Sequence, residues 1–201
     1  GIAAIDGDTG SGIPASGPPL MSGGEGAAQD RLAVFGSRAD GYGEDRDRPD
    51  RDRTARRSAD LKFGTIAARR VALEVGDGTS GRRAAVRQLA WRDFYAQIMA
   101  EFPHTATSSM RPEYDAIEWR DDPETMEAWQ TGMTGYPIVD AAMRQLLAEG
   151  WIHNRARMIA ASFLVKDLLI DWRSGERHFR RLLVDGDLSQ NIGNWQWVAG
   201  T

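Results

Sequence analysis

Cysteine is absent from this 201-residue sequence, and histidine occurs only at positions 104, 153 and 178. Without cysteine there is no disulfide bond, no thiolate metal site and no cysteine nucleophile. The histidines show no metal-ligand spacing, so we expect no metal centre. No apolar run approaches the roughly 18 residues that a membrane span requires, so no membrane insertion is expected. A basic start followed by an apolar stretch is also lacking, so no secretory signal is expected.

The composition is typical of a globular protein. Hydrophobic residues make up 41% and charged residues 27%, enough to bury a core without the charge excess of disordered chains. The length suits one domain, or one domain plus an irregular arm. We expect the protein to be a cytoplasmic monomer. The net charge of −4 argues only weakly against nucleic-acid binding, because the distribution of Lys and Arg matters more than their sum.

Apolar residues recur at helical spacing along most of the sequence. Residues 1–24 are rich in Gly, Ser, Pro and Ala and are predicted to form a linker, whereas residues 25–201 are predicted to form one helical domain. Asp122 before Pro123 predicts a helix start, with Gly132 as the stop. Because no alternating strand pattern occurs, the expected fold class is all-α, with helices over residues 25–35, 65–74, 83–101, 123–131, 137–149, 154–170 and 176–184.

Residues 40–60 alternate acidic residues with Arg and carry almost no apolar side chains. This pattern predicts a solvated loop that partly faces a ligand. Within it, Thr54 and Ser58 bracket Arg56 and Arg57. Hydroxyls and backbone N–H groups near a helix start can cradle a pyrophosphate, although a charged surface loop explains these residues equally well. Neither glycine-rich nucleotide-binding motif occurs in the sequence.

Asp185 and Asp187 flank Gly186 just after the last expected helix. The two carboxylates could bind a cation, accept hydrogen bonds from a cofactor ring or cap the next turn. Capping is the simplest explanation, and a metal is the least favoured one because no further carboxylate lies close by.

Two further patterns each have more than one explanation. Six of the seven Trp residues lie between positions 119 and 197, which fits an aromatic core, an oxidisable chain or a stacking platform. Asn154, Arg155 and Met158 share one helical turn, with Arg157 to one side. Their amide, guanidinium and thioether groups suit contacts with bases and phosphates, whereas an ordinary helix start with solvated arginines fits as well.

Taken in order, four segments resemble the photolyase and cryptochrome family over about residues 23–201. The resemblance implies a helical FAD-binding domain, with the family's N-terminal α/β antenna domain, its folate or deazaflavin chromophore and the C-terminal end expected to be missing. The residue types around Asn154 and Met158 are most similar to class I cyclobutane pyrimidine dimer photolyases. The segments are RPDRDRTARRSADLKFG, RQLAWRDFY, EAWQTGMTGYPIVDAAMRQLLAEGWIHNRARMIAASFLVKDLLIDWRSGERHF and DGDLSQNIGNWQWVAGT.

The resemblance implies that FAD is bound in a U shape inside the helical domain. Residues 42 and 54–58 match positions at the phosphates and the adenine side, and Arg157 and Asp185 match an ion pair beside the flavin ring. Asp187 matches a carboxylate at the ring's amide edge. Asn191 matches the Asn that faces the reactive flavin nitrogen in photolyases, which favours repair over signalling. The implied cofactor-binding positions are Tyr42, Thr54, Ala55, Arg56, Arg57, Ser58, Arg157, Asp185, Gly186, Asp187 and Asn191.

The resemblance also implies binding of damaged DNA that contains pyrimidine dimers. The implied lesion and DNA positions are Gln88, Trp91, Arg92, Asn154, Met158 and Trp197, with Arg46 and Arg155 toward the backbone. An electron chain to the flavin maps onto Trp195, Trp172 and Trp119, which with Asn191 form the implied catalytic set.

Three residues depart from the family pattern. Many relatives have Glu where Gln88 stands, so repair efficiency is open. The loop reads TARRS where the family usually has TSRLS, so Ala55 lacks a hydroxyl and Arg57 replaces an apolar packing residue. We therefore expect looser phosphate binding.

The implied reaction is light-driven repair. A damaged dinucleotide is flipped out of the duplex, excited reduced FAD donates an electron to it, the dimer bonds split and the electron returns. The alternatives are a cryptochrome with the same flavin fold and no repair activity, and a flavin-free helical module that binds nucleic acid.

Overall fold

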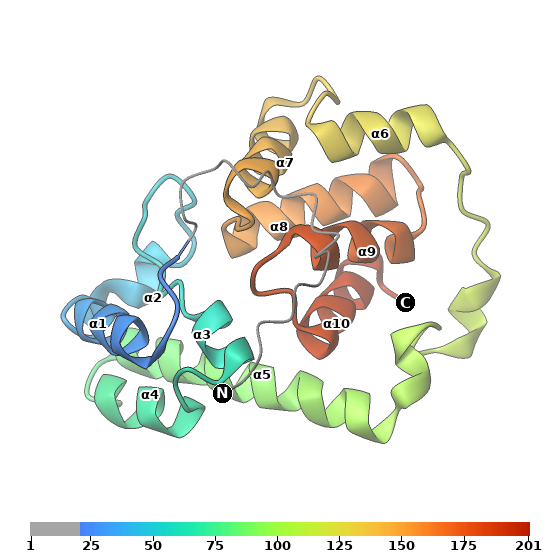
Figure 1. The fold of residues 1–201 in the computed structure, drawn as a ribbon. Coiled ribbons are helices and arrows are strands. Elements are labelled where there is room, and N and C mark those ends of the chain that lie inside the picture. The colour runs from blue at the N-terminus through green and yellow to red at the C-terminus, as the bar shows by residue number, and fades with distance from the viewer. Residues whose placement is uncertain (1–20) are drawn as a thin grey trace, which may run out of the picture.

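A computed structural model describes residues 21–201, which form an all-helical structure (Figure 1). No strand occurs within these residues, so the expected all-α class is confirmed. Residues 1–20, most of the predicted linker, lie outside the described part. The α-helices are α1 (Glu25–Gly36), α2 (Tyr42–Asp45), α3 (Ser58–Phe63), α4 (Ala68–Val75), α5 (Ser80–Glu101), α6 (Pro123–Thr131), α7 (Pro137–Glu149), α8 (Asn154–Ser162), α9 (Trp172–Leu182) and α10 (Leu188–Ala199).

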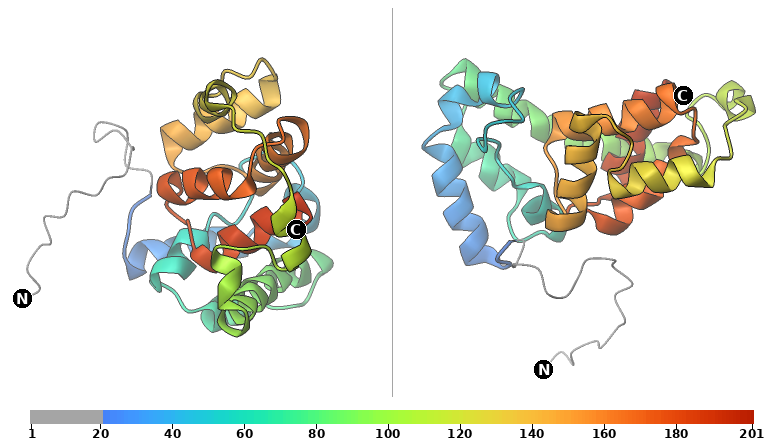
Figure 2. Two further views of the ribbon diagram at one scale, coloured as in Figure 1. Left: turned by 90° about the vertical axis from the view of Figure 1, so that its right-hand side faces the viewer. Right: turned by 90° about the horizontal axis from the view of Figure 1, so that it is seen from above.

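The 22-residue helix α5 runs along one side of the molecule and contacts both halves of it (Figure 1). Helices α2 and α4 pack on it, and α10 packs on it further along. Helices α1 to α4 lie on one side, and α6 to α10 on the other (Figure 2). Between residues 21 and 201, no helix has both the length and the apolar character needed to cross a membrane.

Each half has its own apolar core. The smaller core is formed by buried side chains of α1, α4 and the segments beside them: Ala28, Leu32, Phe35, Ala39, Ile66, Val71 and Val75. The larger core is formed by α6 to α10, and its largest fully buried side chains are Trp129, Met143, Leu146, Ile152, Leu164, Trp172, Phe179 and Ile192. Burial of such side chains supplies the main favourable free energy of folding.

Helix ends follow the capping residues that the sequence predicts. The Asp122 side chain accepts a hydrogen bond from the Thr125 backbone N–H, and α6 ends at Gly132, which has a left-handed φ of 68°. Helix α7 ends in the same way at Gly150, with a φ of 60°. Glycine suits these positions because it has no Cβ to clash there.

Several of the predicted helices have different limits. The helix expected over residues 65–74 is α4, which begins only at Ala68, after Ala67 in an extended conformation. The helix expected over residues 83–101 is α5, which begins earlier because the Thr79 side chain caps it.

The helix expected over residues 154–170 is α-helical only to Ser162, continues as a π-helical turn over Phe163–Asp167 and is broken where Leu169 takes a φ of 57°. Residues on both sides of this change are buried, so the apolar pattern does not mark it. The helix expected over residues 176–184 is α9, which starts earlier because the Asp171 side chain caps it.

The prediction that residues 176–184 form the last helix is wrong, because α10 follows it. The glycines in the segment that follows residue 184 suggest a loop, but Gly193 lies inside α10. A Cβ on Gly193 would lie 2.2 Å from Tyr95 Cδ1 on α5. Gly193 therefore permits close helix packing and does not end the helix.

Residues 40–60 are not simply a solvated loop. They contain α2 and the start of α3, and Asp45, Arg57 and Asp60 are buried. Asp45 accepts a hydrogen bond from Arg51 at 2.9 Å, and Asp60 accepts two from Arg31. Carboxylates can be buried here because arginines pair with them.

Candidate functional site

A cavity of about 500 Å³ lies between the two halves of the molecule. Its size falls within the roughly 300–1,000 Å³ of typical small-molecule sites. Helices α2 to α5 form one wall, and α8, α10 and the turn before α10 form the other. The cavity brings together most of the predicted site residues: Tyr42, Arg46, Thr54, Ala55, Arg56, Arg57, Ser58, Gln88, Trp91, Arg92, Asn154, Arg155, Arg157, Met158, Asp185, Asp187 and Trp197.

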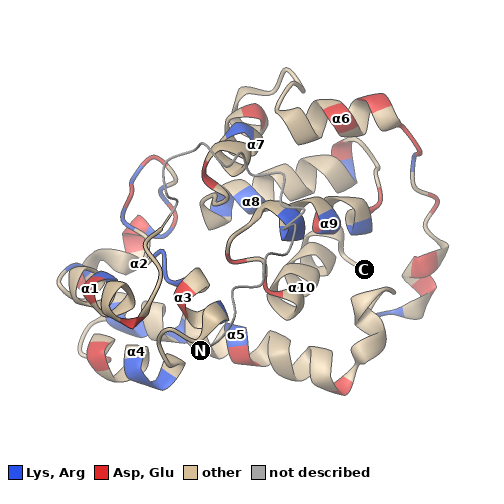
Figure 3. Ribbon diagram, viewed as in Figure 1, with Lys and Arg blue, Asp and Glu red and all other residues tan. Residues whose placement is uncertain are grey.

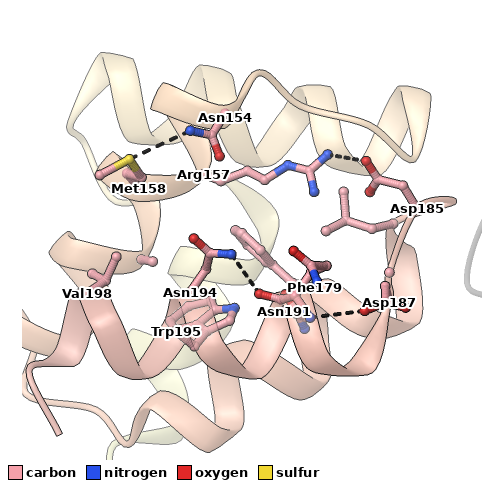
Figure 4. A pocket seen from close by; sticks show the side chains of 14 residues that line it. Asn154, Arg157, Met158, Phe179, Asp185, Asp187, Asn191, Asn194, Trp195 and Val198 are labelled. Atoms are coloured by element: carbon pink, nitrogen blue, oxygen red, sulfur yellow. Dashed lines mark hydrogen bonds and ion pairs between the residues drawn. The ribbon is translucent and has the colours of Figure 1, made fainter. Parts of the chain in front are cut away.

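A smaller cavity of about 80 Å³ adjoins the large one (Figure 4). The two share wall residues from α8 and from the turn before α10, including Asn154, Arg157 and Asp185. The predicted residues Gly186, Asn191 and Trp195 line the smaller cavity. Of the predicted set, only Trp119 and Trp172 line neither cavity.

An ion pair holds the wall that the two cavities share (Figure 4). Arg157 Nη2 donates to Asp185 Oδ2 over 2.8 Å, and the Ser58 hydroxyl donates to the same oxygen. Burial alone would raise the pKa of the Asp185 carboxyl, but Arg157 and these hydrogen bonds outweigh burial and lower it. The other oxygen, Asp185 Oδ1, is buried and has no hydrogen-bond partner within residues 21–201. It can therefore accept a hydrogen bond from a ligand.

Asp187 has the capping role that the sequence suggests. Its side chain accepts hydrogen bonds from the Gln190 backbone N–H at 3.0 Å and from the Ser189 hydroxyl at 2.7 Å. It also lines both cavities. The carboxylate thus fixes the start of α10 while it remains next to the space where a ligand would bind.

Residues 54–58 have the geometry of an anion site. Arg56 has a left-handed φ of 46°, and Arg57 follows with φ −111° and ψ 0°. Neighbouring residues of opposite handedness point successive N–H groups toward one side, which makes a concavity that binds anions. Within residues 21–201, no backbone N–H of residues 54–58 donates to another backbone group. The Thr54 hydroxyl is also buried without a partner in this part of the chain.

Arg57 occupies an interior position, as expected from the apolar residue that relatives have there. Its side chain is buried, and Nη2 donates to the Ala28 carbonyl over 2.9 Å. Nε and Nη1 have no hydrogen-bond partner among the described residues. Burial lowers the pKa of the guanidinium. A partly unpaired buried charge of this kind costs free energy until an anion or a polar group satisfies it.

Asn191 is held by Glu176, a residue that the sequence reasoning missed. Asn191 Nδ2 donates to the Glu176 carbonyl and to Glu176 Oε1, both at 3.0 Å. Glu176 is buried and pairs with Arg180 over 3.0 Å. The amide of Asn191 is therefore fixed in orientation.

The predicted lesion-binding side chains lie at the larger cavity with aromatic surface exposed. Trp91 is 47% exposed and Trp197 is 68% exposed, although both line the cavity. Exposed indole rings are suited to stacking on bases. Asn154 Nδ2 lies 3.8 Å from Met158 Sδ, as their shared helical turn predicts. Gln88 Nε2 donates to the Ala84 carbonyl.

The tryptophans predicted as an electron chain belong to the larger core. Trp172 and Trp195 are buried, and Trp119 is partly buried and packs against this core. A Cβ on Gly175 would lie 2.2 Å from the Trp195 ring, so α9 lies directly against that indole. Packing explains these residues, and the electron chain stays a prediction.

The sequence reasoning also missed two contacts at the cavity wall. The Arg56 guanidinium lies over the Trp151 ring, 4.0 Å from its centroid. Lys62 donates to the Val184 carbonyl over 3.3 Å. The first contact joins loop 46–57, and the second joins α3, to a segment about a hundred residues away in the sequence. No local sequence pattern predicts such contacts. No group of three or more His, Asp or Glu side chains within residues 21–201 is arranged to hold a metal ion.

Comparisons with known proteins agree with this geometry. Residues 85–201 match the family described as the FAD binding domain of DNA photolyase. A deoxyribodipyrimidine photo-lyase of Streptomyces griseus is 51% identical over 187 residues, which are 92% of this chain and 40% of that protein. The Escherichia coli protein of the same name is 47% identical over 169 residues, which cover 80% of this chain and 35% of its own length.

Solved structures give the same result. The crystal structure of a class III photolyase from Agrobacterium tumefaciens matches with a TM-score of 0.84 and 42% identity, covering 89% of this chain and 38% of that one. A cryptochrome from Synechocystis matches with a TM-score of 0.82 and 30% identity, covering 94% and 41%. The chain spans well under two thirds of the length of these relatives. It belongs to the family of the FAD-binding domain of DNA photolyase.

Proposed function

We propose that this chain binds FAD in the large cavity. The supporting observation is that residues far apart in the sequence converge on one space of about 500 Å³, among them Ser58 and Asp185, which are 127 positions apart. The N–H groups of residues 54–58 and the Thr54 hydroxyl, which have no partner within residues 21–201, suit the pyrophosphate. The buried Asp185 Oδ1, also without a partner in that part of the chain, suits a ring N–H of the flavin.

We propose that the full protein repairs cyclobutane pyrimidine dimers in DNA. Bound FAD supplies the light-absorbing electron donor. The chain's own residues then bind and orient the DNA: Trp91 and Trp197 offer stacking surfaces, and Asn154 and Met158 line the same cavity. The phosphates would be held by Arg46, Arg92 and Arg155, which line the same cavity.

The wall around the flavin would exclude water and fix the flavin's surroundings. Asn191, oriented by Glu176, and the Arg157–Asp185 pair would stabilise the reduced anionic ring, because preorganised dipoles and charges act strongly in a site without bulk water. Trp195, Trp172 and Trp119 would carry electrons to the ring. Replacing Asn191 by Ala should change the redox state of the flavin and leave DNA binding intact.

The proposal extends to the organisation of the protein. Residues 25–201 would form one domain that binds both FAD and DNA, in a cytoplasmic monomer. An antenna chromophore, a folate or a deazaflavin, would be bound outside these residues. Light scattering of the purified full-length protein tests the monomer, and its absorption spectrum tests both pigments.

The deciding experiment is a repair assay with the full-length protein. A duplex with one thymine dimer is incubated with the reduced enzyme under blue light and in the dark, and restored thymines are counted. Repair only in the light supports the proposal. A flavin spectrum without repair supports the cryptochrome alternative, for which the Synechocystis structure is an argument. A colourless protein that binds DNA supports the flavin-free module.

A further inference from the structure

An acidic side chain pairs with two of the arginines that are expected to bind DNA. Arg155 Nε and Nη2 donate to Asp47 Oδ1 over 2.8 and 2.5 Å. Arg155 Nη1 lies 3.4 Å from Met158 Sδ, so every nitrogen of this guanidinium has a partner. Arg46 Nε lies 3.6 Å from the same Asp47 oxygen. One carboxylate therefore lies between two arginines at the cavity.

The three charges are open to solvent. The side chain of Asp47 is 51% exposed, that of Arg155 35% and that of Arg46 30%. They lie where the loop after α2, which carries both acidic and basic residues, meets the start of α8 (Figure 3). The hydrogen bonds from Arg155, followed by the charges of both arginines, lower the pKa of the Asp47 carboxyl. The carboxyl is therefore ionised at neutral pH, and it resembles a phosphate oxygen in its hydrogen bonds.

We propose that Asp47 sets the affinity for DNA by competing with a backbone phosphate for Arg155. A phosphate that binds Arg155 through the same two nitrogens must first displace the carboxylate, because Nε and Nη2 both already donate to Asp47 Oδ1. The displaced Asp47 stays nearby and repels the phosphate. The inference rests on the proposed DNA binding and adds a residue that opposes it.

The proposal has two measurable consequences. Asp47→Asn removes the competing charge and the repulsion, so DNA binding should tighten about fivefold, the range expected for a single exposed charge pair. The affinity should also fall more steeply with salt, because one more uncompensated arginine releases a counterion; the slope of log K against log salt should change by about one.

The test uses the full-length protein and a fluorescein-labelled duplex with one thymine dimer. Anisotropy titrations are run at several salt concentrations for the wild type, Asp47→Asn and the matched control Asp50→Asn. Asp50 lies on the same loop and pairs with Arg48 over 2.6 Å, away from Arg46 and Arg155. The same two Asn substitutions are then made in an Arg155→Gln background.

The outcomes separate the two proposals. Competition for Arg155 is supported if Asp47→Asn binds DNA more tightly and Asp50→Asn does not. The gain must also be lost in the Arg155→Gln background. Binding no tighter than that of Asp50→Asn overturns it, and so does a gain that persists unchanged without Arg155. If the wild type binds neither damaged nor intact duplex, the proposed function itself fails, whatever the variants do.

Discussion

The hydrogen bond from Arg157 Nη2 to Asp185 Oδ2, 2.8 Å long, joins α8 to the turn before α10. The Asp185 side chain is 2% exposed, whereas that of Arg157 is 24% exposed. Because Ser58 donates to the same oxygen, the pair also ties α3 to the other half of the molecule. The contact is both part of the proposed flavin site and a link between the two cores.

Asp185→Asn should destabilise the protein by about 3 kcal/mol, because it leaves the Arg157 charge partly buried without its partner. Urea unfolding followed by circular dichroism at pH 7 gives the free energy. The control Asp50→Asn, in an exposed pair, should change it far less. Equal effects of the two substitutions would show that the buried pair contributes no more to the free energy of unfolding than the exposed pair does.

Arg57→Leu should stabilise the flavin-free protein by about 2 kcal/mol, because an apolar side chain replaces a buried charge with two unpartnered nitrogens. The control is Arg56→Leu, which should destabilise because it removes the stacking on Trp151. Thermal unfolding of flavin-free samples measures both. A lower melting temperature for Arg57→Leu would mean that Arg57 is satisfied by groups beyond its single bond to Ala28.

His178 should make the protein less stable in mild acid. Burial, and then the charge of Arg181, lower the pKa of the imidazole from 6.5 to about 4. The unfolded chain therefore binds a proton that the folded chain excludes, and stability falls as the pH falls from 6.5 toward 4. His153 acts in the same direction, since burial and Arg155 lower its pKa as well.

Unfolding free energies at pH 7, 6, 5 and 4 measure this effect. His178→Gln should flatten the dependence on pH in part, leaving the share of His153. His104→Gln, at an exposed position, is the control for replacing a histidine by glutamine. An unaltered slope for His178→Gln would show that the imidazole is protonated in the folded state.

Gly193→Ala should destabilise by about 2 kcal/mol or more, because the new Cβ would lie 2.2 Å from Tyr95 Cδ1 and overpacking forces the helices apart. The matched control is Gly26→Ala, where no atom lies within 4 Å of the position that the new Cβ would take. Adding Tyr95→Ala should recover part of the loss. Gly193→Ala with unchanged stability would show that α5 and α10 separate at little cost.

Local sequence signals predicted helix ends but not close approaches. Asp122 and Gly132 mark the ends of α6 because capping depends on residues within one turn. Gly193 resembles loop punctuation in the sequence because its role depends on Tyr95, almost a hundred residues away. The π-helical turn after Ser162 has no local signal for a related reason, since buried apolar residues continue through it.

The site was predictable only through the family resemblance. Residue types alone left loop 54–58 as either a phosphate cradle or a charged surface, and only the fold brings Ser58 to Asp185. No local sequence pattern indicated that Asp60 is buried beside Arg31 or that Glu176 accepts hydrogen bonds from Asn191. Each depends on hydrogen bonds or ion pairs between separate helices. This pairing offsets the free-energy cost of burying a charge or an amide that has no partner.

The cavity separates the apolar cluster around Phe35 from the cluster around Trp129. Any molecule that fills it contacts both, so its binding free energy adds to that of folding: at 100 times its dissociation constant the gain is about 2.7 kcal/mol. Protein made without that molecule would unfold more often and be degraded sooner by cellular proteases. The cellular supply of the molecule that fills the cavity would then determine how much of the protein accumulates, even in the dark.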